Sequence, residues 1–138
     1  MLHNIQVTTF DMNRLFAMIE QLRKNGFRET ANLEKLEEEL ARSDEVAPSE
    51  VTADVVTMNS RVRFCFDGSE QEVTMTLTYP KDMNGDPEQL SILTPVGTAL
   101  LGLKVGDSIS WERPDGALFE LSVRGIEYQP ERDGQYHR

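Results

Sequence analysis

Residues 8–43 carry hydrophobic side chains at helical spacing, in two stripes separated by Asn25-Gly26. Asn and Gly tolerate the left-handed backbone that ends a helix, so the pattern predicts two helices joined by a short turn. Thr8 is a candidate N-cap, with Asp11 three residues later as in a capping box. This part of the chain, residues 1–47, is therefore expected to form an antiparallel helical hairpin, a short coiled coil. The stripes consist of Leu15, Ile19 and Leu22, and of Leu33, Leu36 and Leu40.

From residue 55 onward the hydrophobic period changes from helical to two, which is typical of half-buried strands. The acidic stretch 44–54 contains Pro48 and is interpreted as a linker. In the last strand the alternation of apolar residues shifts by one position at Gly125, which indicates a β-bulge. Residues 48–138 are thus expected to form a second domain with an antiparallel sheet, and the whole chain an α+β fold. The predicted strands are centred on Val62–Phe66, Val73–Tyr79, residues 90–93, residues 108–112, and a final strand from Phe119.

One short helix lies between two of these strands, and both of its ends can be located from the sequence. Thr94 can cap the helix with its hydroxyl, and Pro95 fits the first helical position, where a missing N–H costs nothing. Gly102 is a plausible terminator. The segment predicts a capped helix packed among strands.

Composition and charge narrow the classes of function. The chain has 138 residues, 38% of them hydrophobic and 28% charged, and a formal net charge of −10. A strongly acidic protein repels nucleic acid, so direct sequence-specific binding to DNA or RNA is not expected. The sequence contains no apolar run long enough to cross a bilayer and no signal-peptide pattern, and its single cysteine excludes an internal disulfide. A cytoplasmic protein without membrane contact is expected.

The residue types that perform catalysis or bind metals do not form a recognisable motif. His3 and His137 lie near the two termini, and Cys65 has no histidine partner in the pattern. Cys65 is interpreted as a small residue on a strand face. Trp111 shares a strand face with Ile109, so it is expected to pack in the core or half-exposed, with an interface role as the alternative. No catalytic residue, metal site or cofactor is expected, and an enzyme is disfavoured.

The run from Ser91 to Asp107 also resembles a known family. Its pattern, S-x-x-[ST]-P-x-G-x-A-L-L-G-x-K-V-G-D, is similar to the C-terminal domain of the Gre transcript-cleavage factors. The segments 54–62, 77–80 and 127–130 more specifically resemble the regulators of nucleoside diphosphate kinase (Rnk), which are Gre homologues.

The resemblance implies an FKBP-like C-terminal domain and a protein that docks on bacterial RNA polymerase at the rim of its secondary channel. In Gre factors the Ser-Pro region at the start of this helix contacts the rim, which here corresponds to Ser91, Thr94, Pro95 and Val96. Thr94 and Pro95 can also be explained simply as a helix cap and a first-turn proline, and a solvent-facing cap can serve as a contact as well.

The expected tip of the hairpin departs from the Gre pattern. Gre factors carry an acidic pair there that helps to hold a catalytic Mg²⁺ of the polymerase, whereas this tip offers Arg23, Lys24, Arg28 and the single carboxylate of Glu29. The arms are also short. We therefore expect a polymerase-binding regulator without transcript-cleavage activity. The alternatives are a cleavage factor that uses Glu29 alone and, from the fold only, a prolyl isomerase.

Overall fold

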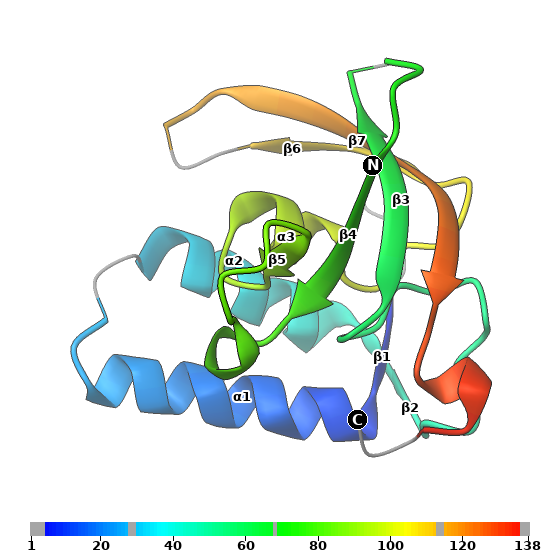
Figure 1. Ribbon diagram of the computed structural model, residues 1–138. Coiled ribbons are helices and arrows are strands. Elements are labelled where there is room, and N and C mark those ends of the chain that lie inside the picture. The colour runs from blue at the N-terminus through cyan, green and yellow to red at the C-terminus, as the bar shows by residue number, and fades with distance from the viewer. Residues whose placement is uncertain (1–4, 28–29, 68, 113–114, 136–138) are drawn as a thin grey trace.

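In the computed structural model, residues 5–27, 30–67, 69–112 and 115–135 are described. Helices occupy the first part of the chain, and a five-stranded sheet with one short helix follows (Figure 1). The helical elements are α1 (Thr9–Lys24), α2 (Thr30–Arg42), α3 (Pro95–Leu100) and the single-turn 3₁₀ helices η1 (Pro80–Asp82) and η2 (Glu131–Asp133). The strands are β1 (Gln6–Thr8), β2 (Asp44–Val46), β3 (Arg61–Phe66), β4 (Val73–Thr78), β5 (Gln89–Ser91), β6 (Ser108–Glu112) and β7 (Leu118–Tyr128).

The helical hairpin forms where the hydrophobic stripes predict it. Thr8 caps α1, with its hydroxyl oxygen accepting a hydrogen bond from the Asp11 backbone N–H at 3.0 Å. The helix ends at Asn25, and Gly26 adopts a positive φ of 77°. Both stripes face inward, and their buried members are Leu15, Ile19, Leu33, Leu36 and Leu40.

The five-stranded sheet has the order β5-β4-β3-β7-β6. The prediction of an antiparallel sheet is wrong at one edge, because β5 pairs with β4 in parallel. The chain after β4 passes through η1 and the loop 83–88 before it enters β5, so it returns to the edge in the same direction as β4. The sheet is therefore mixed. The bulge predicted near Gly125 is confirmed by register shifts between β3 and β7, and the Arg63 side chain fills the space where a Cβ of residue 125 would lie.

The interpretation of residues 44–54 as a linker is wrong at its start. Asp44–Val46 forms β2, which pairs in parallel with β1. The pair joins the two ends of the hairpin at its base, and the Thr9 hydroxyl adds a hydrogen bond to the Val46 carbonyl at 3.2 Å. The acidic side chains that suggested a linker point to solvent from this short strand.

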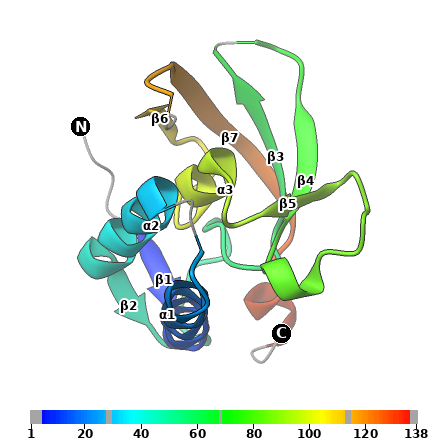
Figure 2. The same ribbon diagram turned by 90° about the vertical axis from the view of Figure 1, so that its left-hand side faces the viewer.

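The hairpin lies against the sheet domain and shares a core with it. Helix α1 runs below the sheet in Figure 1, and α3 lies between α2 and the strands in Figure 2. One continuous cluster of buried side chains joins Leu15 and Leu36 of the hairpin to Phe64, Leu100 and Leu121 of the other part. Trp111 is buried, as its strand face shared with Ile109 predicts. Cys65 is also buried, although it alternates with Phe64 and Phe66 and so lies on the other face of β3. Among the described residues, no helix is both long and apolar enough to cross a membrane.

Candidate functional site

The four residues proposed from the sequence as a docking motif lie together where β5 leads into α3. Thr94 caps the helix, because its hydroxyl oxygen accepts a hydrogen bond from the Gly97 N–H at 3.0 Å. The same hydroxyl donates to the Ser91 carbonyl at 2.7 Å, and the Ser91 hydroxyl oxygen accepts from the Leu93 N–H at 3.1 Å. Ser91, Thr94, Pro95 and Val96 all remain partly exposed. The segment 91–96, which we call the α3 loop, is thus fixed in shape and accessible at its surface.

Gly97 is required for the close approach of the α3 loop to its own helix. A Cβ at this position would lie 2.2 Å from the Ser91 carbonyl oxygen and 3.1 Å from the Cα of Ile92. Both atoms belong to the backbone, so no side chain can move aside to make room. The close packing of the α3 loop therefore requires a glycine at position 97.

Asn32 on α2 ties the hairpin to the α3 loop. Its amide nitrogen donates to the Leu93 carbonyl at 2.6 Å and to the Thr98 hydroxyl oxygen at 3.1 Å. The Thr98 hydroxyl in turn donates to the Ile92 carbonyl at 2.8 Å. Sequence reasoning missed Asn32, because its partners lie more than sixty positions away along the chain. The detectable signal is a polar side chain beside Leu33 on the inward face of a helix.

Replacing Asn32 by alanine is expected to destabilise the protein by about 2 kcal/mol, because the Leu93 carbonyl loses its side-chain donor in a partly buried place. Chemical denaturation measures the loss, and amide hydrogen exchange over residues 92–98 should accelerate. Asn32→Asp is the matched control of the same size. It places an oxygen against the Leu93 carbonyl and should be at least as damaging as alanine. If amide hydrogen exchange over residues 92–98 stayed at its wild-type rate in Asn32→Ala, Asn32 would not hold the α3 loop in place.

The described part of the hairpin tip is basic, but one of its cations is paired. Arg23 forms an ion pair with Glu37 across the two helices at 2.9 Å, and this contact lowers the pKa of the Glu37 carboxyl. Lys24 is exposed. Arg28 and Glu29 lie outside the described residues. Arg23 therefore links α1 to α2 through this ion pair.

A buried carboxyl group joins α1 to the sheet domain. Asp11 is 1% exposed, and its two oxygens accept hydrogen bonds from the Met58 N–H and the Tyr79 hydroxyl, each at 3.1 Å. Burial, followed by the negative charge of Glu131, raises the pKa of Asp11 to about 7. The guanidinium of Arg14 lies 4.1 Å from the centre of the Tyr79 ring. The sequence identifies Asp11 only as part of a helix start.

Glu131 is a second carboxyl group in this region and lies on η2. Its Oε1 accepts a hydrogen bond from the Thr57 hydroxyl at 2.7 Å. Burial raises its pKa as well, while the Thr57 hydrogen bond acts in the opposite direction. Two carboxyl groups from opposite ends of the chain thus lie near the junction of the hairpin and the sheet domain.

No group of three or more His, Cys, Asp or Glu side chains that could hold a metal ion occurs within residues 5–27, 30–67, 69–112 and 115–135. His3 and His137 lie outside these ranges. Cys65 is buried, and its sulfur accepts a hydrogen bond from the Arg124 guanidinium at 3.1 Å.

Both parts of the chain match known protein families. Residues 51–128 match the family described as transcription elongation factor GreA/GreB, C-terminal, and residues 3–46 match the family described as Rnk N-terminus. The chain is 42% identical to a regulator of nucleoside diphosphate kinase from Escherichia coli K12, over 96% of this chain and 95% of that protein. It is 30% identical to a transcription elongation factor GreA from Thermodesulfovibrio yellowstonii, over 77% of this chain and 66% of that protein.

A solved structure has the same fold. A prokaryotic transcription elongation factor GreA/GreB from Nitrosomonas europaea superposes with a TM-score of 0.72 at 42% sequence identity, over 91% of this chain and all of that one. The resemblance predicted from the Ser91–Asp107 run is confirmed. The chain belongs to the GreA/GreB transcription elongation factor family, in the group that carries an Rnk-type N-terminal hairpin.

Proposed function

We propose that this protein is a transcription regulator that binds bacterial RNA polymerase at the rim of the secondary channel through its α3 loop. The observation that carries the proposal is the fixed and partly exposed shape of Ser91, Thr94, Pro95 and Val96, in a chain of the GreA/GreB family. A surface that is already ordered loses little conformational freedom when it docks. The α3 loop would then both cap α3 and contact the polymerase.

The hairpin supports a role without transcript cleavage. Helix α1 has 16 residues, which gives a length of about 24 Å. Its end carries Lys24 and the Arg23–Glu37 pair, so the Glu37 carboxylate is already held by a guanidinium. A short arm whose described end offers its carboxylate to an arginine favours binding at the rim over delivery of carboxylates to the polymerase active site. The protein would then be a non-enzymatic cytoplasmic regulator that competes with Gre factors for the rim.

The name of the Escherichia coli relative suggests the regulated process. That protein is named a regulator of nucleoside diphosphate kinase. A regulator that binds polymerase would alter kinase levels through transcription.

The double variant Thr94→Ala/Pro95→Ala is expected to weaken binding to core RNA polymerase about tenfold, which corresponds to about 1.4 kcal/mol. The loss combines a missing cap with a missing contact surface. Thr94→Ser keeps the capping hydroxyl and should bind like wild type, and Pro48→Ala is a control in a distant turn. Binding is measured by pull-down and by competition with a GreA protein, with circular dichroism on each variant. Unchanged affinity in the folded double variant would move the contact elsewhere.

An assay of backtracked transcription complexes tests the second half of the proposal. We expect no stimulation of transcript cleavage by the wild-type protein. Cleavage that disappears in Glu29→Ala would instead identify a cleavage factor with a single carboxylate. Binding and cleavage are measured separately, so either half of the proposal can fail without the other.

A further inference from the structure

The pair Asn-Gly occurs twice in the chain, at Asn25-Gly26 and at Asn84-Gly85. An Asn followed by Gly is especially prone to a reaction with its own backbone, because glycine has no Cβ to shield its nitrogen from the preceding side-chain amide. The nitrogen can attack that amide and displace ammonia. Both pairs are exposed, so the local structure decides whether each of them reacts.

At Asn25-Gly26 the attacking nitrogen is held by the end of α1. The Gly26 N–H donates a hydrogen bond to the Arg23 carbonyl at 3.2 Å, and the Phe27 N–H donates to the Leu22 carbonyl at 2.9 Å. Asn25 itself has the backbone dihedrals of a helix end, with φ −91° and ψ 9°. The Gly26 nitrogen can reach the Asn25 side chain only if these hydrogen bonds break, so this pair is expected to be protected.

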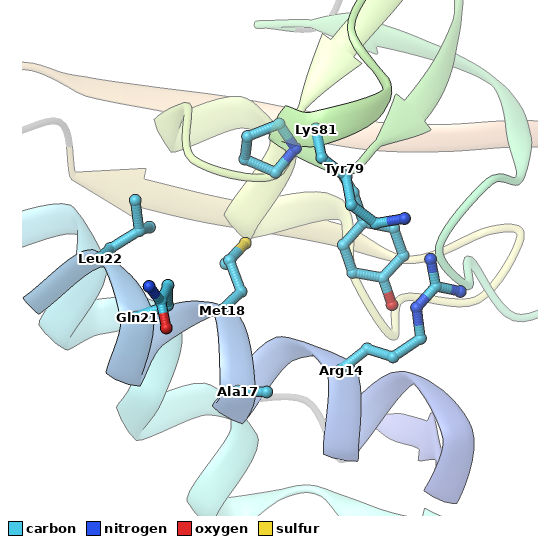
Figure 3. Close-up of a pocket in the computed structure, with 8 residues that line it drawn as sticks. Arg14, Ala17, Met18, Gln21, Leu22, Tyr79 and Lys81 are labelled. Atoms are coloured by element: carbon cyan, nitrogen blue, oxygen red, sulfur yellow. The ribbon is translucent and has the colours of Figure 1, made fainter. Parts of the chain in front are cut away.

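At Asn84-Gly85 the nitrogen is free to move. This pair lies in the loop 83–88, which follows η1, the single turn that faces α1 across the pocket in Figure 3. In Figure 2 the loop extends outward on the right before the chain enters β5, and all of its residues are exposed. Within the part of the chain that the structure describes, the Gly85 N–H has no hydrogen-bond partner. No atom beyond its chain neighbours lies within 4 Å of the place of its missing Cβ.

The Asn84 side chain is turned toward the backbone that would attack it. Its Oδ1 accepts a hydrogen bond from the Asp86 N–H, two residues further on, at 3.0 Å. This contact closes a short ring around the peptide between Asn84 and Gly85. A backbone N–H directed at this oxygen also stabilises the negative charge that develops on it when its carbon is attacked. The hydrogen bond therefore keeps the amide close to the Gly85 nitrogen and assists the reaction.

We propose that Asn84 is a site of spontaneous modification, at which the side-chain amide closes onto the Gly85 nitrogen and the resulting ring opens to aspartate or isoaspartate. In the first step the Gly85 nitrogen forms a bond to the Asn84 Cγ, and the bond from Cγ to Nδ2 breaks. The amide NH₂ leaves with the proton of the Gly85 nitrogen as ammonia. Solvent water then cleaves one of the two carbonyl bonds to the ring nitrogen. Cleavage at Cγ gives aspartate, and cleavage at the backbone carbonyl gives isoaspartate, in which the main chain runs through the side chain.

Isoaspartate at this position would change the start of β5. Gln89, the first residue of β5, holds both sides of the loop, because its Nε2 donates to the Asp82 carbonyl at 3.1 Å and its Oε1 accepts from the Asn84 N–H at 2.9 Å. Isoaspartate lengthens the main chain before Gly85 and removes the oxygen that the Asp86 N–H binds. Because β5 has only 3 residues, its pairing with β4 should loosen.

The two Asn-Gly pairs provide a comparison within one protein. The folded protein is incubated in mildly alkaline buffer, which favours loss of the proton from the attacking nitrogen, and its peptides are then analysed by mass spectrometry. We expect residue 84 to be modified about tenfold faster than residue 25. In concentrated urea the two rates should become similar, because the difference comes from the fold. Labelling with L-isoaspartyl methyltransferase and S-adenosylmethionine identifies the isoaspartate product.

Two variants test the assigned atoms. Gly85→Ala places a Cβ beside the attacking nitrogen and should slow the modification of Asn84 about tenfold. Gly106→Ala is the matched control, because Gly106 also has a positive φ with open space around it, and should leave the rate unchanged. Circular dichroism shows that both variants are folded. In the modified wild-type protein, amide hydrogen exchange over residues 89–91 should accelerate.

Three results would overturn the proposal, and none of the measurements involves polymerase. Equal rates at residues 25 and 84 in the folded protein would show that the loop 83–88 does not promote the reaction. An unchanged rate in Gly85→Ala would exclude the Gly85 nitrogen as the attacking group. Unchanged exchange over residues 89–91 in the modified protein would remove the effect on β5.

Discussion

Raising the pH from 4 to 8 is expected to lower the free energy of unfolding by on the order of 4 kcal/mol through Asp11 alone. The pKa of this carboxyl is 3.8 in an unstructured chain and about 7 in the folded protein. Burial is the main cause, and the negative charge of Glu131 adds to it. The Met58 N–H, the Tyr79 hydroxyl and Arg14 act in the opposite direction and are outweighed.

The direction follows from proton binding. Below pH 3.8 the Asp11 carboxyl is protonated in both the folded and the unfolded chain, so its contribution to stability is fully present. Between pH 3.8 and about 7 the folded protein keeps a proton that the unfolded chain has released, so stability falls as the pH rises. Above about pH 7 the loss is complete. The raised pKa of Glu131 acts with the same sign.

Urea unfolding over this pH range, for wild type and Asp11→Asn, isolates the effect. The asparagine does not titrate, and it retains an oxygen for the Met58 N–H and an amide that can donate to the Tyr79 hydroxyl oxygen. Its stability should therefore depend much less on pH. Asp44→Asn removes an exposed carboxylate from β2 and should keep the wild-type dependence. Parallel curves for wild type and Asp11→Asn would contradict the role assigned to the buried carboxyl.

Gly97→Ala is expected to destabilise the protein by about 3 kcal/mol, because the new Cβ meets backbone and can be accommodated only if the chain shifts. The atoms that must move belong to Ser91 and Ile92, so the α3 loop changes shape even in the folded state. Polymerase binding should consequently fall together with stability. Thermal unfolding and the competition assay with a GreA protein measure the two effects.

Gly85→Ala separates crowding from backbone strain. Gly85 has a φ of 89°, and no heavy atom lies within 4 Å of the position of its missing Cβ. Alanine there should cost only about 1 kcal/mol, from the left-handed backbone. Polymerase binding should be unchanged. If Gly97→Ala proved as mild as Gly85→Ala, the close packing of the α3 loop would not be a constraint.

Local signals in the sequence predicted much of this structure. The caps at Thr8 and Thr94 were predictable because each hydroxyl bonds an N–H three residues later. The alternation of apolar residues predicted the buried faces of β3, β6 and β7, and the phase slip at Gly125 predicted the bulge. In each case the relevant partner lies nearby in the chain or the pattern extends over a whole strand.

Features that depend on distant partners were not predictable in this way. The strand β2 carries Asp44 and Glu45, so it resembles a linker until its pairing with β1 is known. The parallel direction of β5 depends on the path through η1. Asn32 and Asp11 have ordinary helical positions, and their roles come from Leu93, Thr98, Met58 and Tyr79 in the other part of the molecule.

The pairing of β1 with β2 has a consequence for how proteins of this family can differ. It places the segments that lead into and out of the hairpin side by side, so α1 begins and α2 ends at one fixed base. Residues inserted around Asn25-Gly26 would move the tip outward along the helix direction and leave this base unchanged. The distance that the hairpin reaches can therefore change during evolution without any change in the α3 loop.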